Sequence, residues 1–286
     1  MNPLVILGPG ILGRSLARHA AQCGLDVRLV GRNLAHASRA REELALRWRK
    51  AVREGRLSEQ DEASFVARLQ PMPTLEEALS GADALLEALP EDVSLKQAFW
   101  KRCSEAGLST VLPLTGSSSL PANLLSPSST LGLQNFHLFV PVHRHRVVEH
   151  FAPRNTSPER IRGAEALAKS LGLKLIPITG EAGLPAARMG LAQGLEAMRL
   201  LEQGVAEAES LDALLVSGYG HPCGPLELSD RIGLDLRLAI ADHLYSVTGE
   251  ARFEPPALLR RMVAQGHLGR KSGRGFYHWS PQGEKR

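Results

Sequence analysis

The chain has 286 residues, of which 43% are hydrophobic and 22% are charged, and it carries a formal net charge of +4. This is enough apolar material for a substantial core and more chain than one domain usually takes, so two domains are expected. The lack of a basic tail, the low aromatic content of 5% and the absence of an apolar run of membrane length argue against a nucleic-acid-binding or membrane protein. Three isolated cysteines without a CxxC pair predict a reducing compartment and a cytoplasmic location.

The first predicted element is a short strand that leads through a glycine-rich loop into a helix, in "VILGPGILGRSLARHAAQCG". The spacing Gly8-x-Gly10-x-x-Gly13 is typical of dinucleotide-binding folds when it lies between a strand and a helix. Gly8 permits the tight turn, Gly10 lets a pyrophosphate approach the backbone, and Gly13 lets the helix pack closely. We therefore predict that this loop, with Ile11 and Leu12, binds a dinucleotide at the helix N-terminus.

The second predicted strand, "VRLVGRN", ends at Gly31, Arg32 and Asn33. An NAD-binding protein usually has a carboxylate here, which pairs with a ribose hydroxyl. An arginine can instead hold a 2′-phosphate and stack on the adenine. These three residues are therefore predicted to bind the cofactor, with NADP preferred and NAD possible. The alternative is a solvated arginine with relaxed cofactor choice.

Further apolar runs follow through the first two-thirds of the chain, with helix-like segments between several of them; they are "ALLEAL", "TVLPLT", "LGLQNFHLF" and "LKLIPI". This alternation predicts an α/β fold with a mostly parallel sheet covered by helices. One helix is delimited by Ser157 as N-cap, Pro158 in the first turn and Gly172 after the last. Helical spacing then replaces the strands, in "AARMGLAQGLEAMRLLEQGVAEA" and "LDLRLAIADHLYSVTG". Domains are predicted over residues 1–182 and 183–286.

The stretch "NFHLFVPVHRHRVVEHF", residues 135–151, contains four histidines and one glutamate. A metal cluster, a proton-transfer site and a surface segment would all be compatible with this composition. The spacing matches no familiar zinc pattern, so no metal is expected. Histidine titrates near neutral pH and a carboxylate can fix its tautomer, which suits acid–base chemistry.

Several segments together resemble the 3-hydroxyacyl-CoA dehydrogenase family, of the 3-hydroxybutyryl-CoA dehydrogenase type. The resemblance covers nearly the whole chain and rests on the glycine loop, "LEALPEDVSLKQAFW", "SSSLP", the histidine stretch, "EAMRLLEQGVA", "GHPCGPLELSDRIGLD" and "LGRKSGRGFYHW". It implies a Rossmann-like doubly wound sheet, a smaller all-α domain that usually dimerises, and an active site in the cleft between them. Glu87 and Lys96, in the second of these segments, are expected at the cofactor too.

By this resemblance, His137 is the catalytic acid–base, Glu149 orients it, and Ser118 hydrogen-bonds the substrate oxygen beside it. Hydride transfer between a carbinol and nicotinamide requires such a base for the hydroxyl proton. A satisfied core histidine and an ordinary loop serine are the alternatives. The remaining histidines of the stretch are expected in a loop or on the surface; they are His143, His145 and His150.

Two positions depart from the family's pattern. Ala187 and Val140 stand where the family usually has asparagine near the reacting oxygen. The loss of one such preorganised donor can lower a rate by about 10²–10³-fold. These departures affect the expected substrate more than the expected reaction.

An arginine-rich helix is predicted over "SRAREELALRWRKAVREGR". In the family, the corresponding hairpin helps to hold the CoA nucleotide. Its cations could meet those phosphates or an acidic acyl carrier protein, and they are Arg39, Arg47, Arg49 and Lys50. The alternative is a solvated helix face with Glu42 and Glu43 as internal partners.

We therefore expect an NADP-preferring oxidoreductase that interconverts a 3-hydroxyacyl-CoA thioester and its 3-keto form, as a homodimer through the C-terminal domain. The missing asparagines favour an alternative, a dehydrogenase of a small free hydroxy acid or of a carrier-protein-bound hydroxyacyl unit. A catalytically degenerate NADP-binding protein is a more remote alternative, against which the paired His137 and Glu149 argue.

Overall fold

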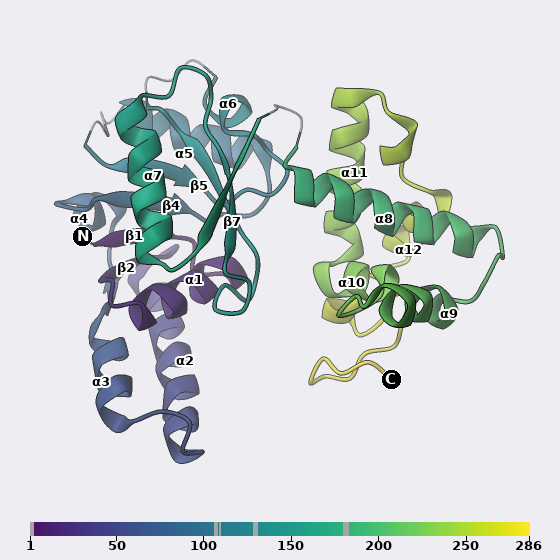
Figure 1. Cartoon of the computed structure of the whole chain (residues 1–286), viewed down its shortest axis with the longest axis horizontal. Helices are drawn as coiled ribbons and strands as arrows, with labels where there is room; N and C mark the ends of the chain where they lie inside the picture. Colours follow the sequence, from purple (N-terminus) through teal and green to yellow (C-terminus); the bar gives the residue numbers. More distant parts are fainter. Residues whose placement is uncertain (1–2, 106–107, 109, 128–130, 180–182) are drawn as a thin grey trace. The chain divides into compact units, whose positions relative to one another are not determined.

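The computed structural model describes residues 3–105, 108, 110–127, 131–179 and 183–286. The chain forms two compact units, Met1–Glu181 and Ala182–Arg286, which Figure 1 colours from purple to teal and from green to yellow. The predicted boundary after residue 182 lies outside the described residues and stays a prediction. Within the described ranges, no helix is both long and apolar enough to cross a bilayer.

Unit 1 is built on an eight-stranded sheet of order β3-β2-β1-β4-β5-β6-β7-β8. The strands are β1 (Leu4–Leu7), β2 (Val27–Val30), β3 (Leu69–Met72), β4 (Ala84–Glu87), β5 (Leu112–Thr115), β6 (Gln134–Leu138), β7 (Val147–Phe151) and β8 (Lys174–Ile178). Neighbouring strands run parallel except β6 and β7, which are antiparallel. This confirms the predicted α/β fold with a mostly parallel sheet. The strand order reverses between β1 and β4, and ligands of such sheets bind at that point.

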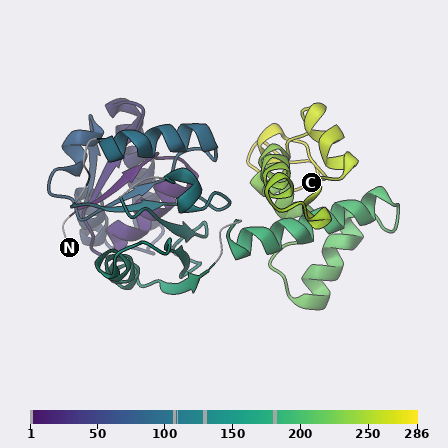
Figure 2. The same cartoon turned by 90° about the horizontal axis from the view of Figure 1, so that it is seen from above.

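Helices cover both faces of this sheet, as the doubly wound prediction requires. They are α1 (Ile11–Gln22), α2 (Leu34–Arg53), α3 (Glu59–Ala67), α4 (Leu75–Leu79), α5 (Val93–Glu105), α6 (Ala122–Leu125) and α7 (Pro158–Ser170). Figure 2 shows α5, in blue, and α7, in green-teal, on opposite faces. The limits of α7 follow the predicted signals, because Ser157 accepts from the Arg160 amide, Pro158 opens the helix, and Gly172 has a φ of 61° after it.

The arginine-rich insert forms the predicted helix, α2, which pairs with α3 in a hairpin that projects from the sheet (Figure 1). Trp48 is buried to 1% exposure, and its ring lies 5.5 Å from the ring of Phe65 on α3. Apolar contacts of this kind hold the two helices together, which leaves the charged side chains of α2 on the outer surface.

Unit 2 is helical, as predicted. Its elements are α8 (Pro185–Glu202), α9 (Ala208–Ala213), the π-helix η1 (Leu214–Gly218), α10 (Pro225–Ile232), α11 (Leu234–Thr248), η2 (Ala251–Phe253), α12 (Ala257–Ala264) and η3 (Arg270–Ser272). The two segments with predicted helical spacing correspond to α8 and α11. Gly249, in the left-handed conformation at φ 65°, ends α11.

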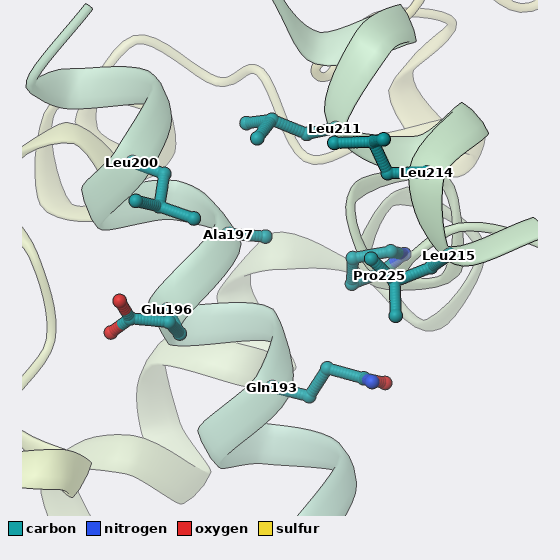
Figure 3. Close-up of a pocket in the computed structure, with 8 residues that line it drawn as sticks. All are labelled: Gln193, Glu196, Ala197, Leu200, Leu211, Leu214, Leu215 and Pro225. Atoms are coloured by element: carbon teal, nitrogen blue, oxygen red, sulfur yellow. The ribbon is translucent and has the colours of Figure 1, made fainter. Parts of the chain in front are cut away.

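An apolar pocket of about 220 Å³ lies between α8 and the α9–α10 region of unit 2. Figure 3 shows Ala197 and Leu200 on one side and Leu211 and Leu214 on the other, while Glu196 turns its carboxylate away. The pocket therefore suits an apolar group rather than an anionic one.

The glycine-rich C-terminal tail is fastened to α10 by one buried carboxylate. Asp230 accepts hydrogen bonds from the amides of Phe276 and Tyr277, each at 3.0 Å, and from Trp279 Nε1 at 2.9 Å. A second buried carboxylate, Asp212 on α9, accepts from the Tyr277 hydroxyl at 2.8 Å. The segment "LGRKSGRGFYHW" thus has a structural role within unit 2.

Arg237 on α11 is a buried cation for which the described part of the chain provides no ion-pair partner. It is 5% exposed, and neither its Nε nor its Nη2 has a hydrogen-bond partner among the described residues. Burial lowers the pKa of Arg237 from 12.5 to about 10. Because this pKa lies below the ordinary value, the cost of burying the charge is fully present at neutral pH and is relieved only above about pH 10.

The substitution Arg237→Met is therefore expected to stabilise the protein, by an amount on the order of 1–2 kcal/mol, because it removes an unpaired buried charge and keeps the side-chain volume. Calorimetry should show a melting temperature raised by a few degrees. Arg199→Met is the matched control, since Arg199 Nη2 donates to the carbonyls of Ala251, Arg252 and Glu254, and its loss should lower the melting temperature. A decrease for Arg237→Met as large as that of the control would contradict the expectation.

Candidate active site

The predicted glycine loop lies between β1 and α1, at the carboxyl edge of the sheet. Gly8 has a φ of 94°, and a Cβ there would lie 2.6 Å from the carbonyl oxygen of Ala88 after β4. A Cβ at Gly13 would overlap the Gly8 carbonyl oxygen. Packing within the protein therefore requires glycine at both positions. The close contact between Gly8 and Ala88 also brings the ends of β1 and β4 together, where the strand order reverses.

Gly10 differs, because, its own chain neighbours aside, no atom of the described residues lies within 4 Å of a Cβ built on it. The space that such a Cβ would fill lies open at the N-terminus of α1, which has no side-chain cap and no acidic residue in its first turn. Free backbone N–H groups and the helix dipole make this a site for an anion. The residues present thus fit the pyrophosphate of a dinucleotide. Ile11 beside it is 75% exposed, whereas Leu12 packs against Gly116 and the core.

Two of the residues predicted to bind the cofactor at the end of β2, Arg32 and Asn33, have different surroundings. The Arg32 side chain is exposed and has no hydrogen-bond or ion-pair partner among the described residues. The side chain of Asn33 caps α2, since its Oδ1 accepts from the amide of His36 at 2.9 Å. The Arg32 side chain can therefore contact a ligand, whereas the side-chain oxygen of Asn33 already accepts a hydrogen bond from the His36 amide.

Glu87 and Lys96, predicted as cofactor contacts, form a buried ion pair. Their exposures are 0% and 1%, and Lys96 Nζ lies 2.5 Å from Glu87 Oε1. Thr115 Oγ1 donates to the other carboxylate oxygen at 2.7 Å, and the amide of Leu89 donates to Oε1 at 2.6 Å. These hydrogen bonds and the ion pair stabilise the loop that follows β4. Direct contact of Glu87 and Lys96 with a cofactor stays a prediction.

Glu91, which the sequence analysis did not single out, organises the serine loop after β5. It accepts from Ser117 Oγ at 2.6 Å, from the amides of Ser118 and Ser119 at 3.1 and 3.0 Å, and from Ser119 Oγ at 2.8 Å. Burial alone would raise the pKa of Glu91, but Lys96 and these donors outweigh it and lower the pKa. Ser117 and Ser119 are buried and Ser118 is partly exposed, so Ser118 is the serine of this loop that can meet a substrate.

His137 and Glu149 face each other across the antiparallel pair β6–β7. The register places them directly opposite, and His137 Nδ1 lies 2.7 Å from Glu149 Oε2. Both side chains are largely buried, at 12% and 8% exposure. The carboxylate holds the ring through Nδ1, which leaves Nε2 for a reacting group.

Strand register also brings Ser118 and His137 to one edge of the sheet. Thr115 at the end of β5 is paired with Asn135 on the parallel strand β6. Ser118 and His137 follow these two residues by three and two positions, so both lie toward the carboxyl ends of the strands. Val142, in the loop after β6, donates its amide to Ser15 Oγ on α1 at 2.9 Å and fastens this loop beside the helix that starts at the glycine loop.

One prediction for the histidine stretch is wrong. His150 is neither in a loop nor on the surface: it lies on β7 at 4% exposure, and its Nε2 lies 2.7 Å from Gln134 Oε1. Successive residues of a strand point to opposite faces, so Glu149 reaches His137 while His150 enters the core. His143 and His145 lie in the loop between β6 and β7. Among the residues described, no three His, Cys, Asp or Glu side chains are grouped as a metal site requires.

Cations gather where α1, α2 and the β6–β7 loop meet. Burial and the nearby guanidinium groups of Arg47 and Arg144 lower the pKa of Arg18, and Arg18 Nε has no hydrogen-bond partner among the described residues. Burial and the cations Arg18 and Arg144 also lower the pKa of His143. We call Arg18, Arg47, Arg144 and His143 the cationic cluster. An anion bound at the cationic cluster would relieve the electrostatic repulsion between its members.

The other predicted cations of the insert lie elsewhere. Arg49 and Lys50 pair with acidic side chains, Glu62 at 3.5 Å and Glu54 at 3.8 Å, and Arg39 is exposed. Glu43 pairs with Arg14 of α1 at 2.8 Å. Val140 is 43% exposed in the β6–β7 loop, and Ala187 lies in the first turns of α8 in unit 2.

A glycine loop of the dinucleotide-binding type, with a paired histidine and glutamate at the same edge of a doubly wound sheet, is typical of a nicotinamide-dependent dehydrogenase. The models of the 3-hydroxyacyl-CoA dehydrogenase NAD-binding domain and C-terminal domain match residues 4–181 and 183–279. The chain therefore belongs to the 3-hydroxyacyl-CoA dehydrogenase family, and it is an NAD(P)-dependent oxidoreductase. This confirms the resemblance and the class of enzyme inferred from the sequence.

Three relatives are similar over nearly their whole length. The probable 3-hydroxybutyryl-CoA dehydrogenase of Bacillus subtilis is 31% identical over 284 residues, 98% of each chain. The (S)-3-hydroxybutyryl-CoA dehydrogenase of Ralstonia eutropha is 30% identical with a TM-score of 0.89, and the match covers 98% of this chain and 99% of that one. A Mycobacterium tuberculosis structure, FadB2, is 28% identical with a TM-score of 0.90, over 97% of this chain and 98% of its own.

Proposed function

We propose that the enzyme interconverts a 3-hydroxyacyl-CoA thioester and its 3-keto form, with NADP as the preferred cofactor. The observation that carries this proposal is the 2.7 Å contact between His137 Nδ1 and Glu149 Oε2 at the nucleotide-binding edge of the sheet. Relatives named 3-hydroxybutyryl-CoA dehydrogenase support the substrate class. The proposed setting is fatty acid metabolism in the cytoplasm.

The glycine loop would hold a nicotinamide cofactor, which when bound would supply or accept the hydride at C3 of the substrate. In the oxidative direction, His137 Nε2 accepts the proton of the substrate hydroxyl, and in the reductive direction it returns a proton to the carbonyl oxygen. Glu149 keeps Nδ1 protonated and stabilises the charged ring that forms when Nε2 takes up the proton. Ser118 Oγ donates a hydrogen bond to the same substrate oxygen in place of its 3.5 Å hydrogen bond to Glu91 Oε1, and Glu91 positions Ser118 through its backbone amide.

The NADP preference is supported by the end of β2. Gly31 stands where a ribose-binding carboxylate would be expected, and Arg32 is exposed and unpaired among the described residues. A guanidinium group in this position favours a 2′-phosphate. In a reducing cell, NADPH would favour the reductive direction.

The cationic cluster supports a substrate that carries phosphates, as coenzyme A does. An acyl group on a carrier protein is the second candidate, because a phosphopantetheine arm and an acidic protein surface would also suit these cations. Ala187 and Val140, in place of the family's asparagines, favour this candidate or a free hydroxy acid over an ordinary acyl-CoA. A degenerate NADP-binding protein would show cofactor binding without turnover.

The deciding experiment follows nicotinamide absorbance with acetoacetyl-CoA, in parallel with NADPH and NADH. We expect turnover with NADPH and a KM for NADPH at least about tenfold below that for NADH, because one charge-assisted contact is worth about tenfold. Equal KM values would contradict the cofactor preference. NADPH binding without turnover of acetoacetyl-CoA would contradict the substrate, and carrier-bound and free hydroxy acids would then be compared.

The exposed apolar side chains of unit 2 support a homodimer through this unit. Leu214, which lines the apolar pocket of Figure 3, is 63% exposed, and Tyr219, which follows η1, is 80% exposed. A second copy would cover these side chains, which are unusual on a free surface. Sedimentation equilibrium should give twice the monomer mass of 31.0 kDa.

A further inference from the structure

Gly31 and His36 compete for one space at the end of β2. A Cβ on Gly31 would lie 3.0 Å from His36 Nδ1, and 3.1 Å from both His36 Cβ and the Ala37 amide nitrogen. Gly31 is not among the glycines with positive φ, so its backbone would accept a side chain. The missing side chain is therefore explained by crowding from the His36 side chain and the Ala37 amide, and not by the φ of Gly31.

The imidazole accepts one hydrogen bond from the backbone at the end of β2. The amide of Arg32 donates to His36 Nδ1 at 3.4 Å, and the amide of His36 donates to Asn33 Oδ1 at 2.9 Å. Since Nδ1 accepts this hydrogen bond, the neutral ring carries its proton on Nε2. Nε2 has no partner among the described residues, and the side chain is partly exposed. The ring thus offers a donor at the end of β2, where Arg32 also lies.

We infer that His36 binds the 2′-phosphate of NADP through Nε2 and, together with Arg32, determines the cofactor preference. This inference rests on the proposed NADP preference. In an NAD-binding fold, a carboxylate at this strand end accepts hydrogen bonds from the ribose. Here the His36 side chain, together with the Ala37 amide, crowds the position from which this carboxylate would extend, and the ring offers a donor in place of an acceptor. His36 therefore disfavours the NAD-type contact and supplies an NADP-type contact.

The test uses fragments that isolate the 2′-phosphate. Calorimetric titration of the full-length protein with 2′,5′-ADP and 5′-AMP measures the phosphate contribution without catalysis. For His36→Ala we expect about tenfold weaker binding of 2′,5′-ADP and unchanged binding of 5′-AMP, as for the loss of one hydrogen bond to a charged group. His278→Ala, which removes an exposed histidine of unit 2, is the control and should change neither.

The possible outcomes separate the two proposals. If the wild-type protein binds 2′,5′-ADP no more tightly than 5′-AMP, both the proposed NADP preference and the proposed role of His36 are wrong. If the wild type discriminates and His36→Ala discriminates equally well, the preference stands and the role of His36 is overturned.

A pair of further variants tests the shared space. Gly31→Asp alone should weaken binding of both NADPH and NADH, because the new side chain displaces the imidazole and the start of α2. Gly31→Asp combined with His36→Ala should bind NADH at least about tenfold more tightly than Gly31→Asp alone, because the carboxylate can then reach the ribose. Circular dichroism checks that each variant is folded. Equal NADH affinity of the folded single and double variants would contradict the competition for space.

Discussion

Replacing His137 with glutamine is expected to lower kcat by about 10²–10⁴-fold, the usual contribution of a general acid–base. Glutamine can still hydrogen-bond Glu149 across the β6–β7 pair, but it cannot take up or release a proton at neutral pH. The glycine loop and the end of β2 are unchanged, so the Kd for NADPH should stay within about twofold of wild type, a change of under 0.5 kcal/mol. Stopped-flow absorbance and fluorescence titration measure the two quantities separately.

His150→Gln is the matched control for this substitution. His150 lies next to Glu149 on β7 but points into the core, where its ring meets Gln134. This variant should lose stability and keep kcat in the folded fraction. Similar losses of kcat in both variants would show that the His137 effect is structural, and an unchanged kcat in His137→Gln would remove the proposed mechanism.

The substitution Asp230→Ala is expected to destabilise unit 2 by at least about 3 kcal/mol. It leaves three donors without an acceptor, the amides of Phe276 and Tyr277 and the indole of Trp279, and each buried unsatisfied donor costs about 1–3 kcal/mol. Urea unfolding followed by Trp279 fluorescence, in a variant with Trp48 and Trp100 replaced by phenylalanine, would report this unit.

Asp242→Ala is the control, because Asp242 is an exposed residue of the same unit that pairs with Arg260 on the surface. Surface pairs contribute about 0–1 kcal/mol. If the two aspartate variants unfolded at the same urea concentration, the buried carboxylate would not fasten the tail as described.

The sequence was most informative where local patterns determine structure. The glycine loop, α7 with its Ser157 cap and Gly172 stop, and the helices α8 and α11 all follow from short-range signals. β3 escaped prediction because "LQPM" has a polar residue and a proline, which an edge strand tolerates. β7 was not predicted as a strand because its sequence, "VVEHF", combines a catalytic residue with core residues.

The site was less predictable where it depends on contacts between distant segments. The resemblance placed His137 and Glu149 together, and the strand register brings them into contact. No spacing in the sequence shows that Glu91 gathers the serine loop after β5, or that His150 turns away from His137. These facts arise from the alternation of strand faces and from loops that meet only in the folded sheet.

The close approach of Gly31 and His36 imposes an order on mutational change. A side chain added first at position 31 meets the imidazole at 3.0 Å as well as His36 Cβ and the Ala37 amide nitrogen at 3.1 Å, whereas prior loss of the ring at position 36 removes the shortest of these contacts. An acidic residue at position 31 can therefore be reached through either of two single variants. The variant changed first at position 31 is crowded, whereas the variant changed first at position 36 has only lost its ring. In a laboratory selection that proceeds by single substitutions toward NADH use, changes at position 36 should be fixed before any acidic residue at position 31.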